Sequence, residues 1–318
     1  MRAAFACLLL LTACATTRVD VDLRAHEAEQ VLAILDARAA GKALTERDWA
    51  RLFATEGYRR LKQRESSMGR ELSDEEFRRF VMSDELLKRR AELRATLQAW
   101  RNADLSNAAR QALAFLPKNA GVKAKVYPVI KPKTNSFVFD LERDPAIFIY
   151  LEPLERDTFE GIVAHEFHHI GYAAACKGEG WLTAFGEGIA TYAAANGGKP
   201  RIKPDALAEW ERQQTREREN FEEARDFLQA VQSGKLDESE QKKRGMELFG
   251  IVGPWYTVGY RMASVIDEEL GRDALIAAFC DQHQLLATYN VAARKRKLRT
   301  GEDLPLWPDE LVNGFPNA

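Results

Sequence analysis

The stretch His165-Glu166-Phe167-His168-His169 decides how the rest of this chain is interpreted. Positions i and i+4 of a helix lie on one face, one turn apart, so His165 and His169 can point their imidazoles at one metal ion. Glu166 follows the first ligand and lies beside the metal, where it can take a proton from water without binding the ion. His168 lies about 100° from His169 around the helix, so its side chain is expected to be packed or hydrogen-bonded instead of binding the metal ion. The spacing predicts a helix that carries two metal ligands and a general base.

The third metal ligand is expected on a following helix, because a catalytic zinc ion usually takes three protein ligands and a water molecule. Glu187 stands eighteen residues after His169, in the stretch Gly186-Glu187-Gly188-Ile189-Ala190-Thr191-Tyr192. The small residues of this stretch are expected to let the second helix approach the first closely. Thr191, one turn beyond Glu187, is placed to support the site from behind. We therefore predict one zinc ion per chain, held by His165, His169 and Glu187.

Two other residues remain open as ligands. Glu179 is a rival for the third position, although it stands in a glycine-rich loop that controls its place less well than a helix does. Cys176 is open as a fourth ligand. A fourth ligand would make the site structural, because structural zinc sites usually have four protein ligands.

These residues resemble a known group of enzymes. His165, Glu166, His169 and Glu187 match the pattern of the gluzincins, the metallopeptidase group that includes thermolysin and the zinc aminopeptidases. The string E-G-x-A-x-Y at 187–192 also resembles bacterial proteins described only as zinc-dependent peptidases. In the zinc aminopeptidases, a tyrosine in a Y-x-x-G segment stabilises the transition state. The resemblance implies that role for Tyr256, which opens Tyr256-Thr257-Val258-Gly259, with Tyr260 and His283 as weaker candidates.

The resemblance implies a zinc metallopeptidase that hydrolyses peptide bonds in a peptide or protein substrate. Glu166 would serve as the base that deprotonates the attacking water. The chain has no G-x-M-E-N string, the element with which the aminopeptidases hold a free amino group, so aminopeptidase activity is not implied. Two other functions stay open, namely a zinc-binding lipoprotein that acts in binding or assembly without proteolysis, and a helical scaffold with a structural zinc site.

The N-terminus predicts export and a lipid anchor. Residues 1–13 begin with a basic position and an apolar run too short to span a bilayer, as in a signal peptide. Leu11-Thr12-Ala13-Cys14 resembles the lipobox of bacterial lipoproteins, which implies that Cys14 is lipidated after cleavage. Ala15 follows, not an Asp that retains lipoproteins at the inner membrane, so we expect an outer-membrane anchor facing the periplasm. Surface display and an ordinary secretory signal remain open.

The charge balance limits the classes of binding partner, and the cysteine content limits the possible disulfides. Removing residues 1–13 takes one of 46 basic residues, which leaves 45 against 48 acidic residues and gives no reason to expect nucleic acid. After Cys14, the mature chain keeps Cys176 and Cys280. A disulfide between them and two unpaired thiols are both open, because sequence alone shows no proximity.

The pattern of apolar residues predicts a mostly helical α+β fold. Residues 14–116 are expected to form an all-helical N-terminal region, and 117–318 a gluzincin-like catalytic domain. Short apolar runs between 121 and 151 predict a small antiparallel sheet just before the metal helix. An edge of that sheet could bind a peptide by strand addition, although plain packing explains the same residues. Further on, residues 205–232 predict one long charged helix, and 233–245 a polar connector.

Overall fold

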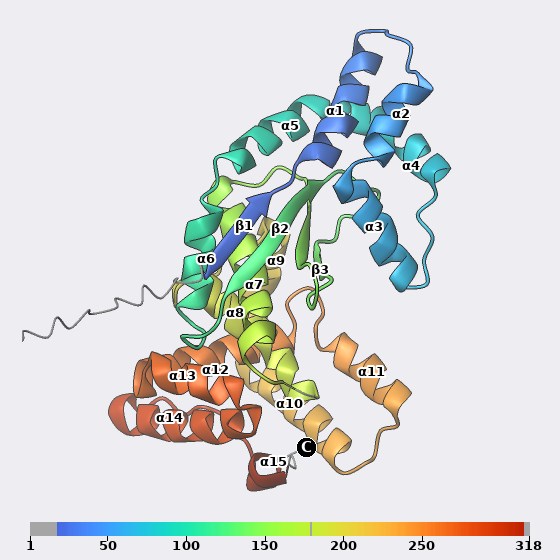
Figure 1. The fold of residues 1–318 in the computed structure, drawn as a ribbon. Coiled ribbons are helices and arrows are strands. Elements are labelled where there is room, and N and C mark those ends of the chain that lie inside the picture. The colour runs from blue at the N-terminus through green and yellow to red at the C-terminus, as the bar shows by residue number, and fades with distance from the viewer. Residues whose placement is uncertain (1–17, 179, 315–318) are drawn as a thin grey trace, which may run out of the picture.

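The computed structural model describes residues 18–178 and 180–314 of the chain, and within them it is mostly helical with one small sheet (Figure 1). The predicted signal at 1–13, the lipidation candidate Cys14 and the rival ligand Glu179 lie outside the described residues. Across the described ranges, no helix combines the length and the apolar character that crossing a membrane requires.

The sheet has four strands in the order β1-β2-β4-β3. Their bounds are Val19–Leu23 (β1), Val122–Val129 (β2), Phe137–Phe139 (β3) and Ala146–Tyr150 (β4). The prediction of an antiparallel sheet is wrong, because β2 runs parallel to both β1 and β4, and only β3 pairs antiparallel with its neighbour. The chain passes from β2 to the outer edge, forms β3 there, and returns to place β4 in the middle. Among the described strands, β3 and β4 therefore pair as an antiparallel hairpin, whereas β1 and β2 pair in parallel and β2 and β3 are not neighbours.

The N-terminal region is not all-helical, because its first described segment is a strand. β1 pairs along its length with β2, from Val19 beside Val122 to Leu23 beside Val126. Its sequence Val-Asp-Val-Asp-Leu alternates between half-buried and exposed positions, the period of two that a strand requires. The alternation is present in the sequence, but the prediction of an all-helical region does not take it into account. Residues from the predicted N-terminal region and from the predicted catalytic domain therefore share one sheet.

Six helices follow β1 and together contribute residues to both faces of the sheet. Their bounds are His26–Ala39 (α1), Glu46–Phe53 (α2), Glu56–Ser67 (α3), Asp74–Val81 (α4), Asp84–Arg101 (α5) and Leu105–Leu113 (α6). Serine and threonine N-caps begin three of them, with the side chains of Thr55, Ser73 and Ser83 accepting from the first-turn amides of α3, α4 and α5. Together with the sheet they form a first hydrophobic core, which extends from Ala25 to Ala194 in sequence.

The remaining helices form the second half of the molecule. Their bounds are Arg156–Ala175 (α7), Gly186–Ala194 (α8), Pro204–Gln214 (α9), Glu217–Gln232 (α10), Glu238–Glu247 (α11), Pro254–Leu270 (α12), Arg272–Cys280 (α13), Leu285–Thr300 (α14) and Asp309–Gly314 (α15), with 3-10 turns at Trp181–Phe185 (η1) and Gln282–Gln284 (η2). The predicted long helix over 205–232 is two helices, and the predicted connector over 233–245 contains most of α11. Asp237 caps α11 with a capping box to Glu240, a signal that its polar composition obscured.

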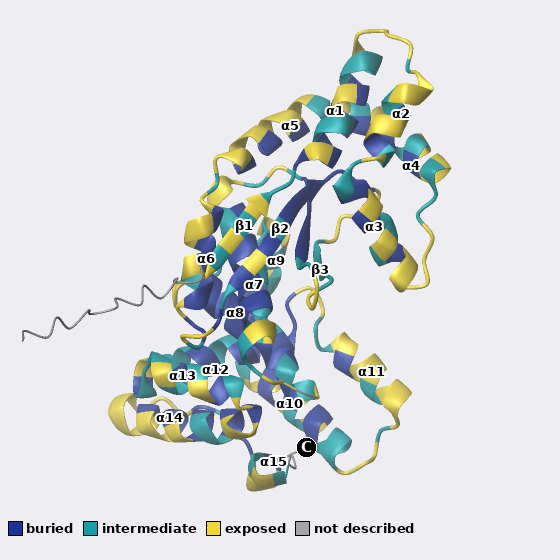
Figure 2. Ribbon diagram, viewed as in Figure 1, coloured by how far each residue is buried: buried dark blue, intermediate teal, exposed yellow. Residues whose placement is uncertain are grey.

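These helices build a second hydrophobic core that is separate from the first. It contains the buried aromatic rings of Phe185, Phe227, Trp255, Tyr289 and Trp307. Figure 2 shows buried residues along the sheet and α7, and again along the inner faces of the lower helices. The metal helix α7 contributes its apolar stripe to the first core, and α8 contributes Ile189 and Tyr192 to the second. The contact between α7 and α8 is therefore the junction of the two cores.

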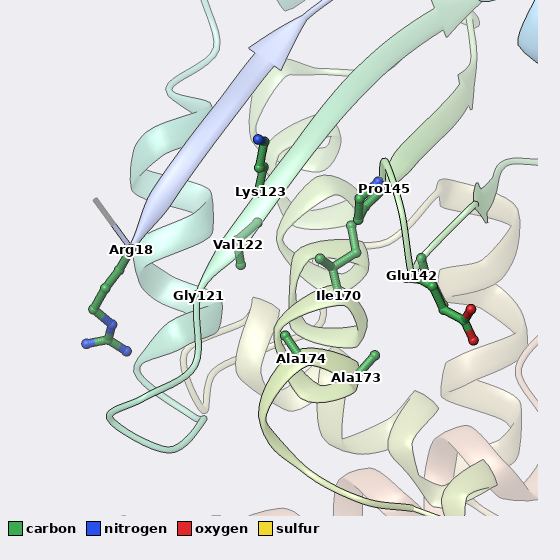
Figure 3. Close-up of a pocket in the computed structure, with 10 residues that line it drawn as sticks. Arg18, Gly121, Val122, Lys123, Glu142, Pro145, Ile170, Ala173 and Ala174 are labelled. Atoms are coloured by element: carbon green, nitrogen blue, oxygen red, sulfur yellow. The ribbon is translucent and has the colours of Figure 1, made fainter. Parts of the chain in front are cut away.

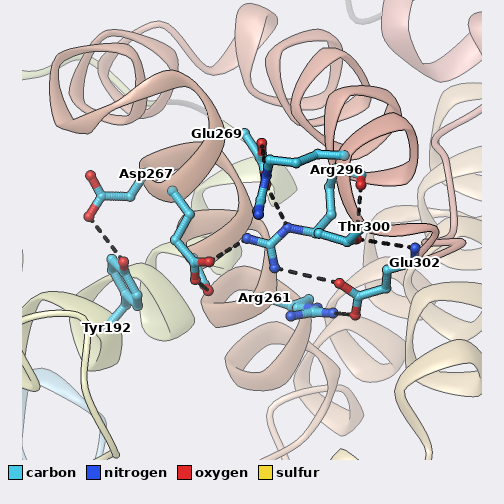
Figure 4. Close-up of polar contacts among 10 residues, drawn as sticks. Tyr192, Arg261, Asp267, Glu269, Arg296, Thr300 and Glu302 are labelled. Carbon is cyan, nitrogen blue, oxygen red and sulfur yellow. Dashed lines mark hydrogen bonds and ion pairs between the residues drawn. The ribbon is translucent and has the colours of Figure 1, made fainter.

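Polar contacts hold α12 in place within the second core. Figure 4 shows Tyr192 of α8 directed at Asp267 of α12, with the hydroxyl donating to the carboxylate over 3.0 Å. On α14, Arg296 lies between Glu269 and Glu302 and is almost fully buried. Because an unpaired charge at such a position would be costly, these pairs fix how α14 packs on α12.

Candidate metal centre

Helix α7 places the predicted ligands at a cleft. Its apolar positions Phe159, Val163, Phe167 and Ile170 are buried in the first core. The opposite face carries His165, Glu166 and His169 into the cleft, as the spacing predicts. Asp157 lies in the first turn of α7, two residues after the cap position Glu155. There it still complements the positive end of the helix dipole.

Three side chains meet at the base of this cleft. Nε2 of His165 lies 3.0 Å from Nε2 of His169 and 3.2 Å from Oε2 of Glu187. The remaining side of the triangle, from Nε2 of His169 to Oε2 of Glu187, measures 3.5 Å. The structure therefore brings together the three residues that the sequence proposed as ligands, and they form a group able to hold a metal ion.

The size and chemistry of this triangle fit a zinc ion. Zinc binds imidazole nitrogen and carboxylate oxygen at about 2.0–2.2 Å, so two ligands of a tetrahedral site lie about 3.3 Å apart. The observed separations of 3.0, 3.2 and 3.5 Å bracket that value. Two nitrogens and one oxygen are also a donor set that suits zinc. The fourth position would face the cleft, as a catalytic site requires.

A hydrogen bond with Thr191 determines which ring nitrogen of His165 is available to bind a metal ion. The hydroxyl of Thr191 donates to the carbonyl oxygen of Glu187 over 2.8 Å, so its proton is already used. Nδ1 of His165 lies 3.3 Å from the same oxygen and must therefore be the donor in that contact. With the proton on Nδ1, the lone pair of Nε2 points at the metal position.

Comparison with known protein families adds to this geometry. A family model described as "Putative zinc dependent peptidase (DUF5700)" matches residues 49–298, which include all the cleft residues named above. The chain belongs to the DUF5700 family. The family description agrees with the predicted zinc-dependent peptidase. No curated protein and no solved structure matches the chain.

Burial and charge shift the pKa values of the groups in this DUF5700 site. Burial raises the pKa of Glu166, and the two neighbouring imidazoles only partly offset the shift. Burial lowers the pKa of His169, but the Glu187 carboxylate outweighs it and raises that pKa to about 9. The same contacts hold the pKa of Glu187 well below its usual range in spite of burial. Without a metal ion, a proton on His169 therefore neutralises Glu187, and a cation would replace that proton.

Tyr256 lies over the same group of side chains. It lies in the first turn of α12, which begins at Pro254, and its ring stacks near that of His165 with 6.4 Å between centroids. Burial and the nearby Glu187 carboxylate raise the pKa of Tyr256, so its hydroxyl stays protonated at neutral pH. The structure therefore places a hydrogen-bond donor where the resemblance implied one.

Two glycines make this approach of α12 to α8 possible. A Cβ atom on Gly188 would lie 2.1 Å from the carbonyl oxygen of Tyr256, and one on Gly259 would lie 2.3 Å from that of Phe185. Such contacts cannot be accommodated without moving backbone. The small residues of α8 were expected to serve its contact with α7, but Gly188 instead faces α12. The stretch around Glu187 thus also contains Gly188, and the stretch around Tyr256 also contains Gly259. These two glycines allow α8 and α12 to come into contact.

The other candidates are placed away from the metal position. Tyr260 donates its hydroxyl to the carbonyl of Gly198 and packs against Trp210, and His283 lies in η2 outside the metal-binding group. His168 is fully buried against Phe279, as expected for a packing residue, and burial lowers its pKa to about 3. Cys176 forms a disulfide with Cys280, with Cα atoms 4.8 Å apart, so its thiol is not a fourth ligand.

The cleft around the metal position has a volume of about 770 Å³ and a largely aromatic lining. The aromatic residues that line it are Phe137, Tyr172, Trp181, Phe249, Tyr256 and Phe279. Sequence reasoning missed Trp181 and Phe249, because they come from η1 and from the loop after α11, where no metal motif draws attention to them. One wall is the outer strand β3, which contributes Phe137 and Val138.

The N-terminal helices support that wall from the other side. The guanidinium of Arg64 in α3 covers the ring of Phe137 at 4.0 Å. Arg60, almost fully buried, pairs with Asp144 over 2.6 Å and so holds the turn between β3 and β4. The N-terminal region therefore shapes the cleft without contributing a metal ligand.

Proposed function

We propose that this chain is a zinc-dependent peptidase of the gluzincin type, with one zinc ion held by His165, His169 and Glu187. The observation that carries the proposal is the triangle of three donor atoms, 3.0–3.5 Å on each side, at the base of an open cleft with Glu166 beside it. A bound zinc ion supplies a Lewis acid that polarises a carbonyl group and lowers the pKa of a water molecule.

Glu166 acts as the base in this proposal. Its carboxylate accepts a proton from the attacking water and passes it to the leaving amine. Burial raises the pKa of Glu166, and a raised pKa suits a group that must both take up and release a proton. The neighbouring imidazoles act in the opposite direction and favour the carboxylate.

Tyr256 stabilises the oxyanion that forms when water adds to the scissile carbonyl. Its hydroxyl remains protonated because its pKa is raised, so it can donate a hydrogen bond at the moment charge develops. Thr191 keeps the imidazole of His165 in the required tautomer. These two residues are contributed by α12 and α8, so the packing of those helices sets the alignment.

The substrate we propose is a peptide or protein in extended conformation. β3 is the outer strand of the sheet, and its free edge beside the metal position can pair with an added strand. The aromatic rings around the cleft favour apolar side chains on that strand. Both features suit a polypeptide better than a small molecule.

We further propose that the enzyme works at the bacterial cell envelope, tethered by lipid on Cys14 to the outer membrane and facing the periplasm. The support is the Leu11-Thr12-Ala13-Cys14 string and the Ala that follows it. A disulfide between Cys176 and Cys280 agrees with an oxidising compartment.

The test compares soluble protein that starts at Ala15 with its Glu166→Gln variant on a proteome-derived peptide library, read by mass spectrometry. We expect cleavage by the parent and none by the variant, with full zinc content in both. A Glu187→Ala variant should lose zinc, which separates the ligand from the base. Absence of cleavage by zinc-loaded parent protein would overturn the peptidase and favour a zinc-binding lipoprotein that acts without proteolysis.

A further inference from the structure

A second hollow lies beside the metal cleft, with a volume of about 490 Å³. Figure 3 shows Ile170, Ala173 and Ala174 on α7 facing the start of β2 on one side and the loop with Glu142 on the other. Its floor is apolar, made of Val122, Pro145 and the three α7 residues. None of these residues belongs to the metal group, so the proposed chemistry leaves this hollow unexplained.

The hollow adjoins the metal cleft. Leu141 and Ala173 line both of them. Ala173 follows His169 by one helical turn and is exposed, and Leu141 is 44% exposed in the loop after β3. The two hollows therefore meet at two exposed apolar side chains, and a bound chain that passes over these does not bury an unpaired polar group against them.

The position of the hollow fits an extended peptide. Ala174 lies about one and a half turns of α7 beyond His169, which is roughly 8 Å along the axis. An extended chain covers about 3.3 Å per residue, so this distance corresponds to two or three residues. β3 lines the cleft with Phe137 and Val138 and leads directly to Leu141. A peptide strand paired with β3 would therefore extend past Leu141 toward the hollow.

We propose that this hollow is a remote side-chain subsite of the peptidase. It takes a bulky apolar residue two or three positions from the cleaved bond. The inference rests on the proposed function and makes its substrate class more specific, as an extended polypeptide cut internally. Arg18, Lys123 and Glu142 are the charged residues that line the hollow beside its apolar floor.

Ala174→Trp tests the subsite, because Ala174 is exposed and lines the hollow but not the metal cleft. The substrates are one long cleaved peptide with leucine at the tested position, the same peptide with glycine there, and a truncated peptide that ends before it. We expect kcat/KM for the leucine peptide to fall about tenfold, toward the value of the glycine peptide. The truncated peptide and the zinc content should be unaffected. Ala95→Trp, at an exposed position of α5, is the matched control.

An equal effect of Ala174→Trp on all three peptides, or no effect, would overturn the subsite while leaving the peptidase in place. A binding measurement decides the matter if the parent cleaves nothing. The photoreactive residue p-benzoylphenylalanine would replace Ala174 in one protein and Ala95 in another, both in the Glu166→Gln background. The subsite is supported if the protein with the photoreactive residue at position 174 preferentially captures library peptides that contain apolar residues. It is overturned, whatever the cleavage assay shows, if this protein captures no more than the protein with the photoreactive residue at position 95.

Discussion

The two larger hydrophobic cores of this molecule contribute to the metal centre in different ways. The first core contains the sheet and the apolar stripe of α7, and through α7 it supplies His165 and His169 from a single helix. The second core contains the aromatic cluster around Trp255, and it positions Glu187 on α8 and Tyr256 on α12. The first pair depends only on helical geometry, whereas the second pair depends on how the two cores dock.

This difference indicates which substitutions should disturb the metal centre most. Changes within one helix should remove a single group, but changes at the junction of the cores should disturb several groups together. Contacts that cross the junction include the disulfide between Cys176 and Cys280 and the packing of α8 against both α7 and α12. The predictions below are ordered by the size of the free-energy change we expect.

Removing the disulfide should have the largest effect on stability. Cys176 follows α7 and Cys280 ends α13, so the bond joins one core to the other across 104 residues of sequence. In the chain-entropy account, a link that closes a loop of this length contributes about 4.7 kcal/mol. We expect Cys176→Ala/Cys280→Ala to lower the free energy of unfolding by about that amount in urea titrations. Parent protein unfolded with a reductant should match the variant, and an unchanged urea midpoint would contradict the role.

Tyr256→Phe should lower turnover without loosening either core. The change removes one donor to the oxyanion, which typically raises the barrier by about 2.7–4 kcal/mol, a loss of 10²–10³ in kcat. Zinc content and the urea midpoint should stay at parent values, because the ring remains in place. Steady-state kinetics on the peptide found in the library screen provide the measurement. Turnover equal to that of the parent would remove Tyr256 from the mechanism.

Gly188→Ala should damage the junction itself. Its new methyl group would lie 2.1 Å from the Tyr256 carbonyl oxygen and 2.2 Å from the Tyr260 nitrogen, so α12 must move. Overpacking of this kind costs about 1–3 kcal/mol, and here it should also reduce both zinc affinity and turnover. Gly121→Ala is the control for the unfolding free energy and for zinc affinity, because its Cβ would meet the nearest atom at an ordinary 3.4 Å. Equal unfolding free energies for parent and Gly188→Ala would show that the helices tolerate a wider separation.

The pH dependence of the free energy of unfolding should report on Glu27, which is buried beside the first core. Burial raises the pKa of Glu27 to about 8, although the Ile130 amide donates to its carboxylate and Lys131 lies nearby. The folded state therefore holds a proton that the unfolded state has released above a pH of about 4.5. The free energy of unfolding should fall as pH rises through that window, by roughly 2 kcal/mol or more between pH 5 and pH 8.

Glu27→Gln should flatten this slope, because an amide keeps the hydrogen bond and does not ionise. Urea titrations at pH 5, 6.5 and 8 would measure it. Burial also lowers the pKa of Lys131 to about 8, but that group changes stability mainly above pH 8, where the sign is opposite. A parent and variant with parallel pH profiles would show that Glu27 is ionised in the folded protein.

Sequence reasoning reached the features of this fold that are local in the chain. The spacing of His165 and His169 fixes their shared face, and the placement of Glu187 on a rigid following helix was correct. The failures concern long-range pairing. β1 pairs with residues about a hundred positions away, and Gly188 contacts α12 instead of α7. No local period records such partners, so the mixed sheet and the aromatic wall of the cleft required the folded chain.

Thr191 should give the smallest effect and the sharpest test of the junction. Its oxygen accepts a hydrogen bond from Nδ1 of His165 on α7 while its proton is donated along α8, so it aligns a ligand of one core from the other. Loss of such a supporting contact typically weakens metal binding 10- to 100-fold, and we expect about tenfold for Thr191→Val. Thr183→Val, which removes a cleft hydroxyl bonded only to Gly180, should leave zinc affinity unchanged. If both variants bind zinc as the parent does in competition titrations, helix α7 alone orients His165, and the second core contributes its ligand without aligning those of the first.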